Sequence, residues 1–291
     1  MNSVEVSILS ISYNHAAFIG RALDSFLQQK TDFSYEIVIA DDASTDNTQE
    51  IIKEYYNKYP EIIRPVLRKT NLGANNNWLD AFKLCRGKYI AFCEGDDYWT
   101  DINKLQLQVN FLNKNSNFSL CFHNAIILDE KDPEFKKIFN DDQQKSITTI
   151  TDVINGWYIS SASMVFRREF LKIPSWFTNI YNGDYLLQLI LADRGPIGYI
   201  NKIMSVYYKT LTGFNTKPEA SGISILDKQI ALLKLFDSEY DYKYHGLVKK
   251  KIRKLNFSII VTKIKTRHPF INSILRMPVY KQVRNIIKQI K

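Results

Sequence analysis

The sequence predicts an α/β fold, a mostly parallel sheet with helices on both faces, followed by a basic helical extension. Three observations predict it. Strand-like and helix-like patterns alternate over the first 95 residues, an order typical of parallel sheets with crossover helices. Polar clusters follow the predicted strands. No acidic residue follows Asp241, whereas 14 Lys or Arg lie from Lys243 to Lys291. The whole chain has a net charge of +9, so residues 1–241 alone have a net charge of −5.

Within the first half, β-rich runs alternate with amphipathic ones. The predicted strands are Val4–Ile11, Tyr35–Ala40, Ile62–Leu67 and Tyr89–Cys93. Pro65 makes the third an edge strand. Between them we expect three helices: one with Phe18, Ala22 and Phe26 on one face and Asn14 as its cap, one capped by Ser44 or Asp46 and running to Tyr59, and one over about Asn76–Cys85.

The second half is predicted in less detail. Leu105, Val109 and Leu112 mark a helix, and a charged loop is expected over Asp129–Lys145. Residues from Ile223 onward read as helical and basic. Further strands are expected at Phe118–Leu128, Ser160–Phe166, Ile197–Ile200 and Ser205–Tyr208, and a further helix at Tyr185–Ala192 after Asn182-Gly183-Asp184.

Composition places the chain among ordinary globular proteins. It has 291 residues, 45% hydrophobic and 24% charged. The cysteines Cys85, Cys93 and Cys121 lack metal-type spacing, which favours free thiols in a reducing compartment. No histidine spacing indicates zinc, no apolar run reaches about 18–20 residues, and the first residues lack a signal-peptide pattern. We therefore expect a cytoplasmic protein. The acidic balance of residues 1–241 argues against nucleic acid as a partner.

The most informative segment is Glu94-Gly95-Asp96-Asp97, directly after the Tyr89–Cys93 strand. Three carboxylates in four positions repel one another unless a cation lies between them. Mg²⁺ and Mn²⁺ are held by oxygen ligands, often one or two carboxylates with water and phosphate. Gly95 is expected to allow a tight turn. A metal–diphosphate site is one interpretation, and an ordinary polar turn is the other.

Two further polar clusters, Ser12-Tyr13-Asn14 and Asp41-Asp42, follow the first two strands. Ligands of parallel sheets bind beyond the carboxyl ends of the strands. The three clusters are therefore expected to converge on one crevice.

The order of motifs resembles the family 2 glycosyltransferases, inverting enzymes with the GT-A fold, in the branch that builds bacterial surface polysaccharides. The matching segments are SILSISYN, EIVIADDAST, NLGANNNWLDAFKLCRGKYI, CEGDDYW and NGDYLLQLILADRGPIGYI, which together span residues 4–208. The resemblance implies a GT-A domain over residues 1–222, with a nucleotide-binding half (1–100) and an acceptor half (101–222), and an extension over 223–291.

The resemblance also implies roles for the acidic segment. Asp96 matches the usual direct ligand of Mn²⁺ or Mg²⁺, which neutralises a departing diphosphate. Glu94 takes the position that typically meets the ribose or a metal-bound water. Asp97 orients a water or the sugar, or else caps the following segment. Asp184 matches the general base that deprotonates the attacking hydroxyl. Its alternative is a helix N-cap.

Nucleotide recognition is implied for the first loops. Tyr13 stacks on the base and Asp42 accepts a hydrogen bond from a uracil-type N3–H, with Asp41 as the alternative. The alternatives to nucleotide binding are that Asp41 and Asp42 only cap the next helix and that Arg68 is a solvated surface residue. The full nucleotide-binding set is Ser12, Tyr13, Asn14, Asp41, Asp42, Arg68, Asn71 and Glu94.

One segment departs from the family pattern. Relatives carry Tyr-Arg-x-His where this chain has Tyr207-Tyr208-Lys209-Thr210, so a third metal or diphosphate contact is in doubt, and Lys209 is the candidate replacement. Weaker metal dependence follows. The candidates for the sugar or acceptor pocket are Asp97, Trp99, Lys104, His123, Asn124, Ser163 and Lys209. A core position is the alternative for Trp99 and His123.

The basic tail suits an anionic membrane surface, with a solvated helical cap as the alternative. The sequence thus predicts a metal-dependent inverting hexosyl- or N-acetylhexosaminyltransferase, peripheral on the inner face of the cell membrane. It uses a nucleotide sugar, foremost a UDP-sugar, and a glycan or polyprenyl-diphosphate-linked acceptor. The rivals are a sugar-phosphate nucleotidyltransferase and a non-catalytic nucleotide-sugar-binding module. The oligomeric state, a homo-oligomer included, stays open.

Overall fold

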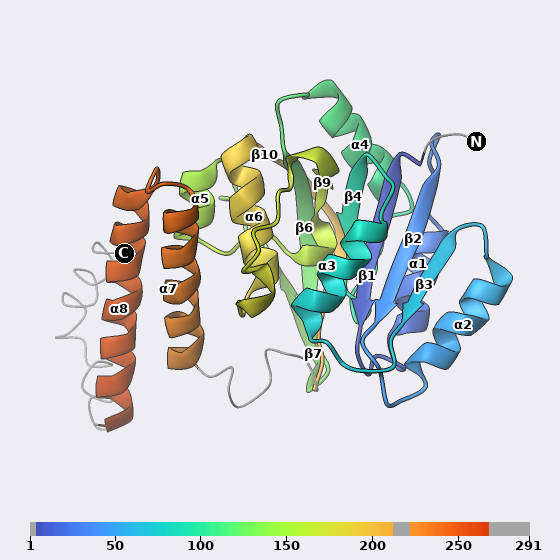
Figure 1. Ribbon diagram of the computed structural model, residues 1–291, viewed down its shortest axis with the longest axis horizontal. Coiled ribbons are helices and arrows are strands. Elements are labelled where there is room, and N and C mark those ends of the chain that lie inside the picture. Colours follow the sequence, from blue (N-terminus) through green and yellow to red (C-terminus); the bar gives the residue numbers. More distant parts are fainter. Residues whose placement is uncertain (1–3, 212–221, 268–291) are drawn as a thin grey trace. The chain divides into compact units, whose positions relative to one another are not determined.

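The computed structural model describes residues 4–211 and 222–267 (Figure 1). The chain divides into two compact units, Met1–Gly213 and Phe214–Lys291. The first unit holds the sheet and every candidate site residue. The second consists of helices in its described part. Each unit is described by itself.

The sheet of the first unit runs in the order β3-β2-β1-β4-β9-β6-β10-β5, with β7 beside β6 and β8 beside β10. β1 is parallel to β2 and β4, β2 to β3, and β6 to β10, whereas β9 is antiparallel to both of its neighbours. The strands are β1 Val6–Ser12, β2 Tyr35–Asp41, β3 Ile63–Leu67, β4 Tyr89–Phe92, β5 Tyr98–Trp99, β6 Leu120–Asp129, β7 Asp132–Ile138, β8 Ile147–Thr148, β9 Val165–Arg167 and β10 Ile197–Lys209. The predicted α/β fold with a mostly parallel central sheet is confirmed, and β3 lies at the edge as Pro65 predicted.

Helices cover both faces of this sheet. α3 lies in front of β1 and β2 in Figure 1, and α1 lies behind them. The helices are α1 Ile19–Leu27, α2 Thr48–Lys58, α3 Ala74–Leu84, α4 Lys104–Lys114, α5 Ile150–Asn155 and α6 Gly183–Arg194, with short 3₁₀ turns at Ser161–Ser163, Arg168–Phe170 and Phe177–Asn179. Each long helix in this list overlaps one that the sequence predicted. The short α5 was not predicted.

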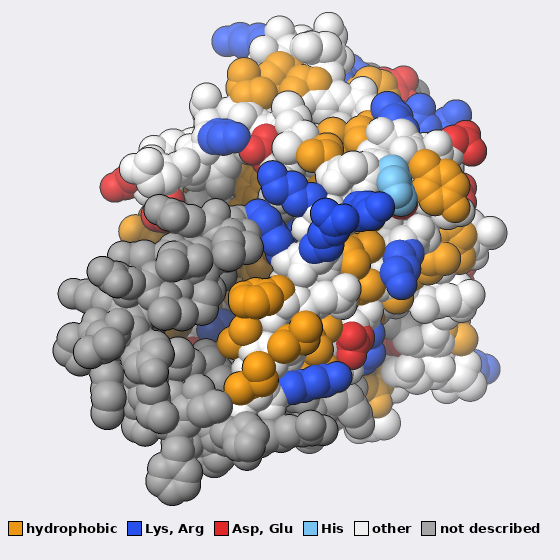
Figure 2. All heavy atoms as spheres, turned by 90° about the vertical axis from the view of Figure 1, so that its left-hand side faces the viewer, with side chains coloured by type: hydrophobic (Ala, Val, Ile, Leu, Met, Phe, Trp, Pro, Cys, Tyr) orange, Lys and Arg blue, Asp and Glu red, His pale blue; other side chains and the backbone are white. Residues whose placement is uncertain are grey.

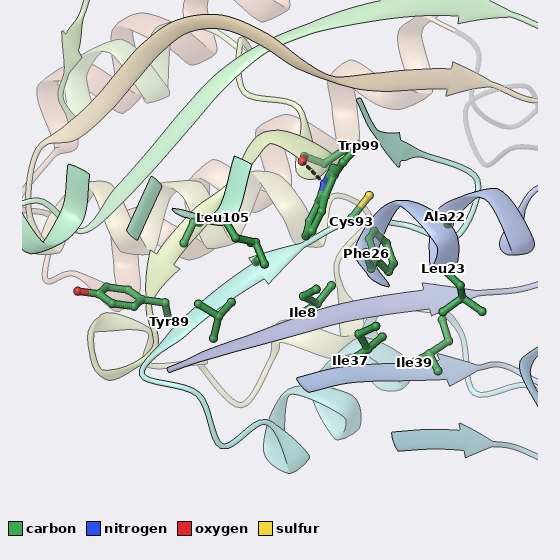
Figure 3. Packing of buried hydrophobic residues seen from close by; sticks show 14 of the residues in the cluster. Ile8, Ala22, Leu23, Phe26, Ile37, Ile39, Tyr89, Cys93, Trp99 and Leu105 are labelled. Atoms are coloured by element: carbon green, nitrogen blue, oxygen red, sulfur yellow. Dashed lines mark hydrogen bonds between the residues drawn. The ribbon is translucent and has the colours of Figure 1, made fainter. Parts of the chain in front are cut away.

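The core forms because alternate strand residues face the apolar stripe of a helix. Figure 3 shows Ile8, Ile37 and Ile39 of the strands packed against Leu23 and Phe26 of α1. Leu105, Val109 and Leu112 of α4 belong to the same buried cluster. On the opposite face Trp78 of α3 packs edge-on against Phe92, with their ring centroids 6.0 Å apart. The packed helices hold the strand ends in place.

Three local expectations were wrong. The expected loop Asp129–Lys145 contains β7, which pairs with β6 as a hairpin. The two short strands expected near the end of the sheet are one strand, β10, with register irregularities between Ile200 and Ser205. Asn14 does not cap α1, which begins after Phe18. It lies in the left-handed region at φ 57°, and its Oδ1 accepts the Thr45 N–H at 2.8 Å.

The second unit contains α7 (Gly222–Glu239) and α8 (His245–Arg267). Lys and Arg side chains gather near the middle of the face drawn in Figure 2. On α8 the exposed basic side chains are Lys249, Lys250, Arg253 and Lys263. Among the described residues, no helix combines the length and the apolarity that crossing a membrane requires. The basic residues predicted beyond Arg267 lie outside the described part of the chain.

Candidate active site

The site lies where parallel strands end together. β1 ends at Ser12, β2 at Asp41 and β4 just before Glu94. Ser12 and Asp41 are register partners, and the Gly95 N–H bonds to the Ile11 carbonyl. The three polar clusters predicted at strand ends therefore share one edge of the sheet.

Asp41 is a structural anchor. It is fully buried, and its carboxylate accepts hydrogen bonds from the Ser44 N–H, the Ser44 hydroxyl, Gln49 Nε2 and the Ser12 hydroxyl. A carboxylate has about four acceptor sites. These contacts occupy them all, so Asp41 holds the two loops together rather than facing a ligand in this conformation.

Asp42 organises the loop after β3. Its two carboxylate oxygens accept the N–H groups of Leu72 and Gly73 at 2.8 and 2.9 Å. Asn71 donates to the Asp42 carbonyl at 3.0 Å. Gly73 has φ 84°, a conformation that favours glycine. Asp42 and Asn71 thus belong to one turn.

The side chain of Arg68 is held by contacts within the protein, whereas that of Tyr13 is exposed. Arg68 donates to Asn77 Oδ1 at 2.7 Å and pairs with Asp80 at 3.2 Å, so it is engaged along α3. The Tyr13 side chain is 44% exposed directly after β1. A planar, exposed ring at this edge is free to stack on a ligand.

Asn75 connects this edge to the second half of the domain. Its Nδ2 donates to the carbonyl of Ile180 at 2.6 Å, just before α6. A Cβ added to Gly183 would lie 2.5 Å from Asn75 Oδ1. A larger residue at 183 would displace the Asn75 side chain, so Gly183 preserves the contact between α3 and the segment before α6 that places Asp184 at the same edge.

The acidic segment and Asp184 form one electrostatic cluster. Burial, together with the charges of Asp96 and Asp184, raises the pKa of Glu94 to about 8. Burial raises the pKa of Asp96. Burial and the charges of Asp96 and Glu94 raise the pKa of Asp97 well above its usual range. These carboxylates disfavour one another's ionised forms, and an added cation would favour the ionised forms again.

Asp97 couples this segment to β10. It is buried, and its Oδ1 accepts the Tyr208 N–H at 2.8 Å. Close packing is a reason for glycine at position 95 that the sequence did not reveal. Gly95 does not have a positive φ, but a Cβ there would lie 2.9 Å from Ile19 Cδ1 and 3.1 Å from His15 Nδ1. The predicted turn is present, because the Asp97 N–H bonds to the Glu94 carbonyl at 3.1 Å, and a larger residue at 95 would displace the Ile19 and His15 side chains.

Two nitrogen-bearing side chains near the acidic segment were missed from sequence. His15 Nε2 lies 3.9 Å from Asp96 Oδ2. The Arg21 guanidinium lies over the rings of Tyr98 and Tyr208, 4.1 and 4.8 Å from their centroids. Both side chains oppose the effect of burial on the pKa of Asp96. Their place after the first strand end was the available signal.

Asp184 lies in the first turn of α6, after the N-cap Asn182. Burial raises its pKa, whereas a backbone hydrogen bond at Tyr185 and one from Trp157 lower it. Trp157 Nε1 donates to Asp184 Oδ2 at 3.4 Å. Sequence reasoning did not select Trp157. A lone tryptophan between a short helix and a buried run was its only signal.

Six of the seven sugar-pocket candidates are buried, among them Trp99, Lys104, His123 and Ser163. Trp99 Nε1 donates to the Ala162 carbonyl (Figure 3), and Ser163 Oγ to the Ser160 carbonyl. Lys104 Nζ lies 3.9 Å from the centroid of the Trp99 ring, and His123 Nδ1 lies 2.8 Å from the Asn124 carbonyl oxygen. For Trp99 and His123 the structure matches the core alternative. A sugar reaches none of these four side chains in this conformation.

The remaining candidates lie elsewhere in the acceptor half. Lys209 Nζ lies 5.2 Å from the Phe135 ring of β7. Asn124 donates to the Asn140 carbonyl at 2.8 Å, and Thr210 is buried. These contacts connect β6, β7 and β10.

The oxygen and nitrogen groups of the site decide which kind of metal site they fit. Among the described residues, no three His, Cys, Asp or Glu side chains converge closely enough to hold an ion unaided. A Mg²⁺ or Mn²⁺ site built from one or two carboxylates, with phosphate and water as the other ligands, needs no such triad. The mutual repulsion of the Glu94–Asp97 carboxylates fits that kind of site.

An α/β sheet with polar loops and carboxylates at its carboxyl edge defines the class of domains that bind a ligand at that edge. Residues 7–173 match the model of the family described as Glycosyl transferase family 2. The chain belongs to this family and carries a glycosyltransferase domain. The rival class of nucleotidyltransferases is thereby set aside.

Two curated relatives are similar to most of this chain. The uncharacterized protein Rv1520 of Mycobacterium tuberculosis is 39% identical over 213 residues, which cover 72% of this chain and 60% of the relative's length. This chain thus spans less than two thirds of that relative. The Escherichia coli protein WfgD is 30% identical, over 69% of this chain and 75% of WfgD. Its name is UDP-Glc:alpha-D-GlcNAc-diphosphoundecaprenol beta-1,3-glucosyltransferase.

Solved structures confirm the GT-A fold. S. aureus TarS 1-349 in complex with UDP-GlcNAc has a TM-score of 0.65 at 20% identity, covering 88% of this chain and 73% of that one. The mannosyltransferase PcManGT of Pyrobaculum calidifontis, in complex with GDP-Man and Mn2+, has a TM-score of 0.60 at 14% identity, covering 98% and 84%.

Proposed function

We propose that this chain transfers a sugar from a nucleotide diphosphate sugar, a UDP-sugar, to a hydroxyl group with inversion. Residues 1–222 form the catalytic domain, and 223–291 its basic extension. One observation carries the proposal: β1, β2 and β4 end at one edge of the sheet, which brings the Glu94–Asp97 segment beside the loops that hold Tyr13 and Asp42. A donor bound at this edge has its base beside β1 and its diphosphate beside the acidic segment.

The donor is held by residues of the first half. The exposed Tyr13 ring stacks on the nucleobase, and the turn organised by Asp42 and Asn71 borders it. Uridine is favoured because WfgD is named for UDP-Glc and TarS was solved with UDP-GlcNAc. Glu94 contacts the ribose or a bound water. Arg68, directly after β3, contacts Asn77 and Asp80 of α3.

Asp96 is the proposed ligand of Mn²⁺ or Mg²⁺. Such an ion would neutralise the charge that develops on the leaving diphosphate. Asp97 holds the segment against β10 through the Tyr208 N–H, so Asp96 keeps its orientation when charge enters the site. The PcManGT complex with GDP-Man and Mn2+ supports a metal at a site of this fold.

Asp184 is the proposed general base. Inversion in one displacement requires one group to take the proton of the attacking hydroxyl. Asp184 lies in the first turn of a helix, where the N–H dipoles favour a carboxylate, while burial keeps its pKa raised. Both effects hold a base that is ionised but able to accept a proton.

The function is tested by release of nucleoside diphosphate from UDP-, GDP- and dTDP-sugars with Mn²⁺ or with EDTA. Release from a UDP-sugar that EDTA suppresses is expected. Asp184→Asn should lower transfer at least about 100-fold while leaving donor binding, measured by thermal shift, within about twofold. Asp193→Asn, at the far end of the same helix, is the matched control. Full transfer by Asp184→Asn would refute the assignment of the base.

The acceptor is proposed to be a polyprenyl-diphosphate-linked glycan, the class in WfgD's name. Such acceptors lie at a membrane. The exposed Lys249, Lys250 and Arg253 of α8, together with the exposed Phe257 and Ile260, suit an anionic lipid surface.

Membrane contact is tested by co-sedimentation with phosphatidylglycerol vesicles. Binding by the full chain is expected, with at least roughly a 100-fold loss in the triple variant Lys249→Glu, Lys250→Glu, Arg253→Glu, because each of the three charges near the surface contributes about 1 kcal/mol. Lys53→Glu on α2 is the control. Equal binding by the triple variant would remove the proposal.

A further inference from the structure

Three aromatic rings from separate segments gather beside Asp184. Phe139 follows β7, Trp157 follows α5 and Tyr207 lies in β10. The ring centroids lie 5.2 Å apart for Phe139 and Trp157, 6.0 Å for Phe139 and Tyr207, and 6.4 Å for Trp157 and Tyr207. The interplanar angles are 65°, 85° and 72°. Edge-to-face contacts of this kind are favourable, so each ring fixes the other two.

This aromatic cluster is open on one side. Trp157 is 47% exposed, although its indole is the largest apolar group of the three. A buried core explains the packing of a tryptophan but not half of its surface in water. Exposed apolar surface rimmed by polar groups marks sites of ligand contact.

The cluster is also joined to the proposed chemistry at two points. Trp157 Nε1 donates to Asp184 Oδ2 at 3.4 Å. The residue after Tyr207 donates its N–H to Asp97 at 2.8 Å. The exposed ring therefore borders the proposed base, and its strand is tied to the acidic segment.

We propose that Phe139, Trp157 and Tyr207 form an acceptor platform, on which the pyranose ring that bears the attacking hydroxyl stacks against the Trp157 indole. The same indole N–H is a positioning group that leaves one oxygen of Asp184 turned to that hydroxyl. This inference rests on the proposed function. The ligand class follows from chemistry: the C–H groups on one side of a pyranose are weakly positive and suit the negative face of an aromatic ring, and its hydroxyls stay in water.

The platform belongs to the acceptor rather than the donor. In a single displacement the base contacts the attacking hydroxyl, and the diphosphate departs on the opposite side of the reacting carbon. A ring fixed to the base by a hydrogen bond is thus adjacent to the nucleophile. Changes at Trp157 should accordingly alter acceptor KM far more than donor KM.

The test compares Trp157→Ala and Trp157→Phe with the wild type. Tyr56→Ala is the control, because Tyr56 is also an exposed aromatic residue but lies on α2, away from the cluster. Transfer from a UDP-sugar to p-nitrophenyl glycosides is measured. For Trp157→Ala we expect about a tenfold rise in acceptor KM, in line with the energy of one aromatic contact, and donor KM within about twofold. Trp157→Phe should restore most of the acceptor KM but keep a reduced kcat, because it lacks the N–H.

A second measurement does not depend on turnover. Saturation-transfer NMR with methyl α-D-glucopyranoside and methyl α-D-mannopyranoside should show saturation of ring C–H protons by the wild type and its loss in Trp157→Ala. Equal signals in the two proteins would overturn the platform, as would an unchanged acceptor KM or a selective rise in donor KM. Absence of nucleotide release from every donor by the wild type would instead refute the proposed function, and the NMR result would still decide the platform.

Discussion

Two glutamates at opposite ends of the same sheet have opposite environments. Glu36 lies at the amino end of β2 and is 2% exposed. It accepts hydrogen bonds from the Ser7 hydroxyl, from the N–H and guanidinium of Arg86, and from Arg64. Burial alone would raise the pKa of Glu36, but these donors together lower it.

Glu94 lies past the carboxyl end of β4, and its surroundings raise the pKa of its carboxyl rather than lower it. Burial raises its pKa to about 8, and the neighbouring charges of Asp96 and Asp184 add to the rise. The chain thus supplies counter-charge to one buried carboxylate and like charge to the other. The fold satisfies the carboxylate of Glu36 with its own donors, whereas the environment of Glu94 is of the kind that is common at functional sites and fits the proposed donor site.

Removing the charge of Glu36 should have the largest effect on stability. Glu36→Gln leaves Arg86 and Arg64 without their partner and should lower the free energy of unfolding by about 2–3 kcal/mol, less than for fully buried pairs because both arginines are partly exposed. Urea denaturation measures it. Glu5→Gln is the control, since the Glu5–Lys88 pair at 3.5 Å is solvent-exposed and should cost at most about 1 kcal/mol. Equal losses would contradict the comparison.

The same substitution at Glu94 should have the opposite sign. With EDTA present at pH 7, Glu94→Gln replaces a carboxyl that must take up a proton on folding, because its pKa is raised to about 8, and should raise the free energy of unfolding by on the order of 1 kcal/mol, while donor turnover falls. Addition of Mn²⁺ with a UDP-sugar should stabilise the wild type more than the variant. Thermal denaturation checks both. A loss of stability as large as that of Glu36→Gln would show that Glu94 is structural.

Lys104 tests the comparison with a buried cation. Burial lowers its pKa to about 7 from an ordinary value of 10.5. Between these pH values the unfolded chain binds more protons than the folded one, so stability from this group should rise as the pH increases from 7 to 10. The difference in unfolding free energy between the wild type and Lys104→Met should change in that window and be nearly constant below it. A pH-independent difference would mean that Lys104 titrates normally.

Much of the fold could be predicted because it depends on local pattern. Continuous β-rich apolar runs located β1, β2 and β4, and helical periodicity located α1, α3 and α4. Asn14 was misjudged because its partner, Thr45, comes from a loop 31 positions away. β7 was missed because its sequence is mostly charged and lacks the apolar residues that predict a strand, although it pairs with β6.

Predicting the candidate site succeeded unevenly for the same reason. The carboxylates of residues 94–97 stand out as a cluster in sequence. Trp157 does not, because only its contact with Asp184, which lies 27 positions later, makes it a candidate. Lys104 and His123 looked like polar ligands of a sugar, but the packing of α4 against the sheet buries both.

The sequence by itself determined the alternation of strands and helices, the family, and which segments carry carboxylates, since these depend on neighbours along the chain. Only the tertiary structure decided that Glu36 is neutralised by arginines while Glu94 faces Asp96 and Asp184. Coulombic and hydrogen-bond energies depend on distance in space, and the packing of α1, α3 and α6 around the sheet sets those distances.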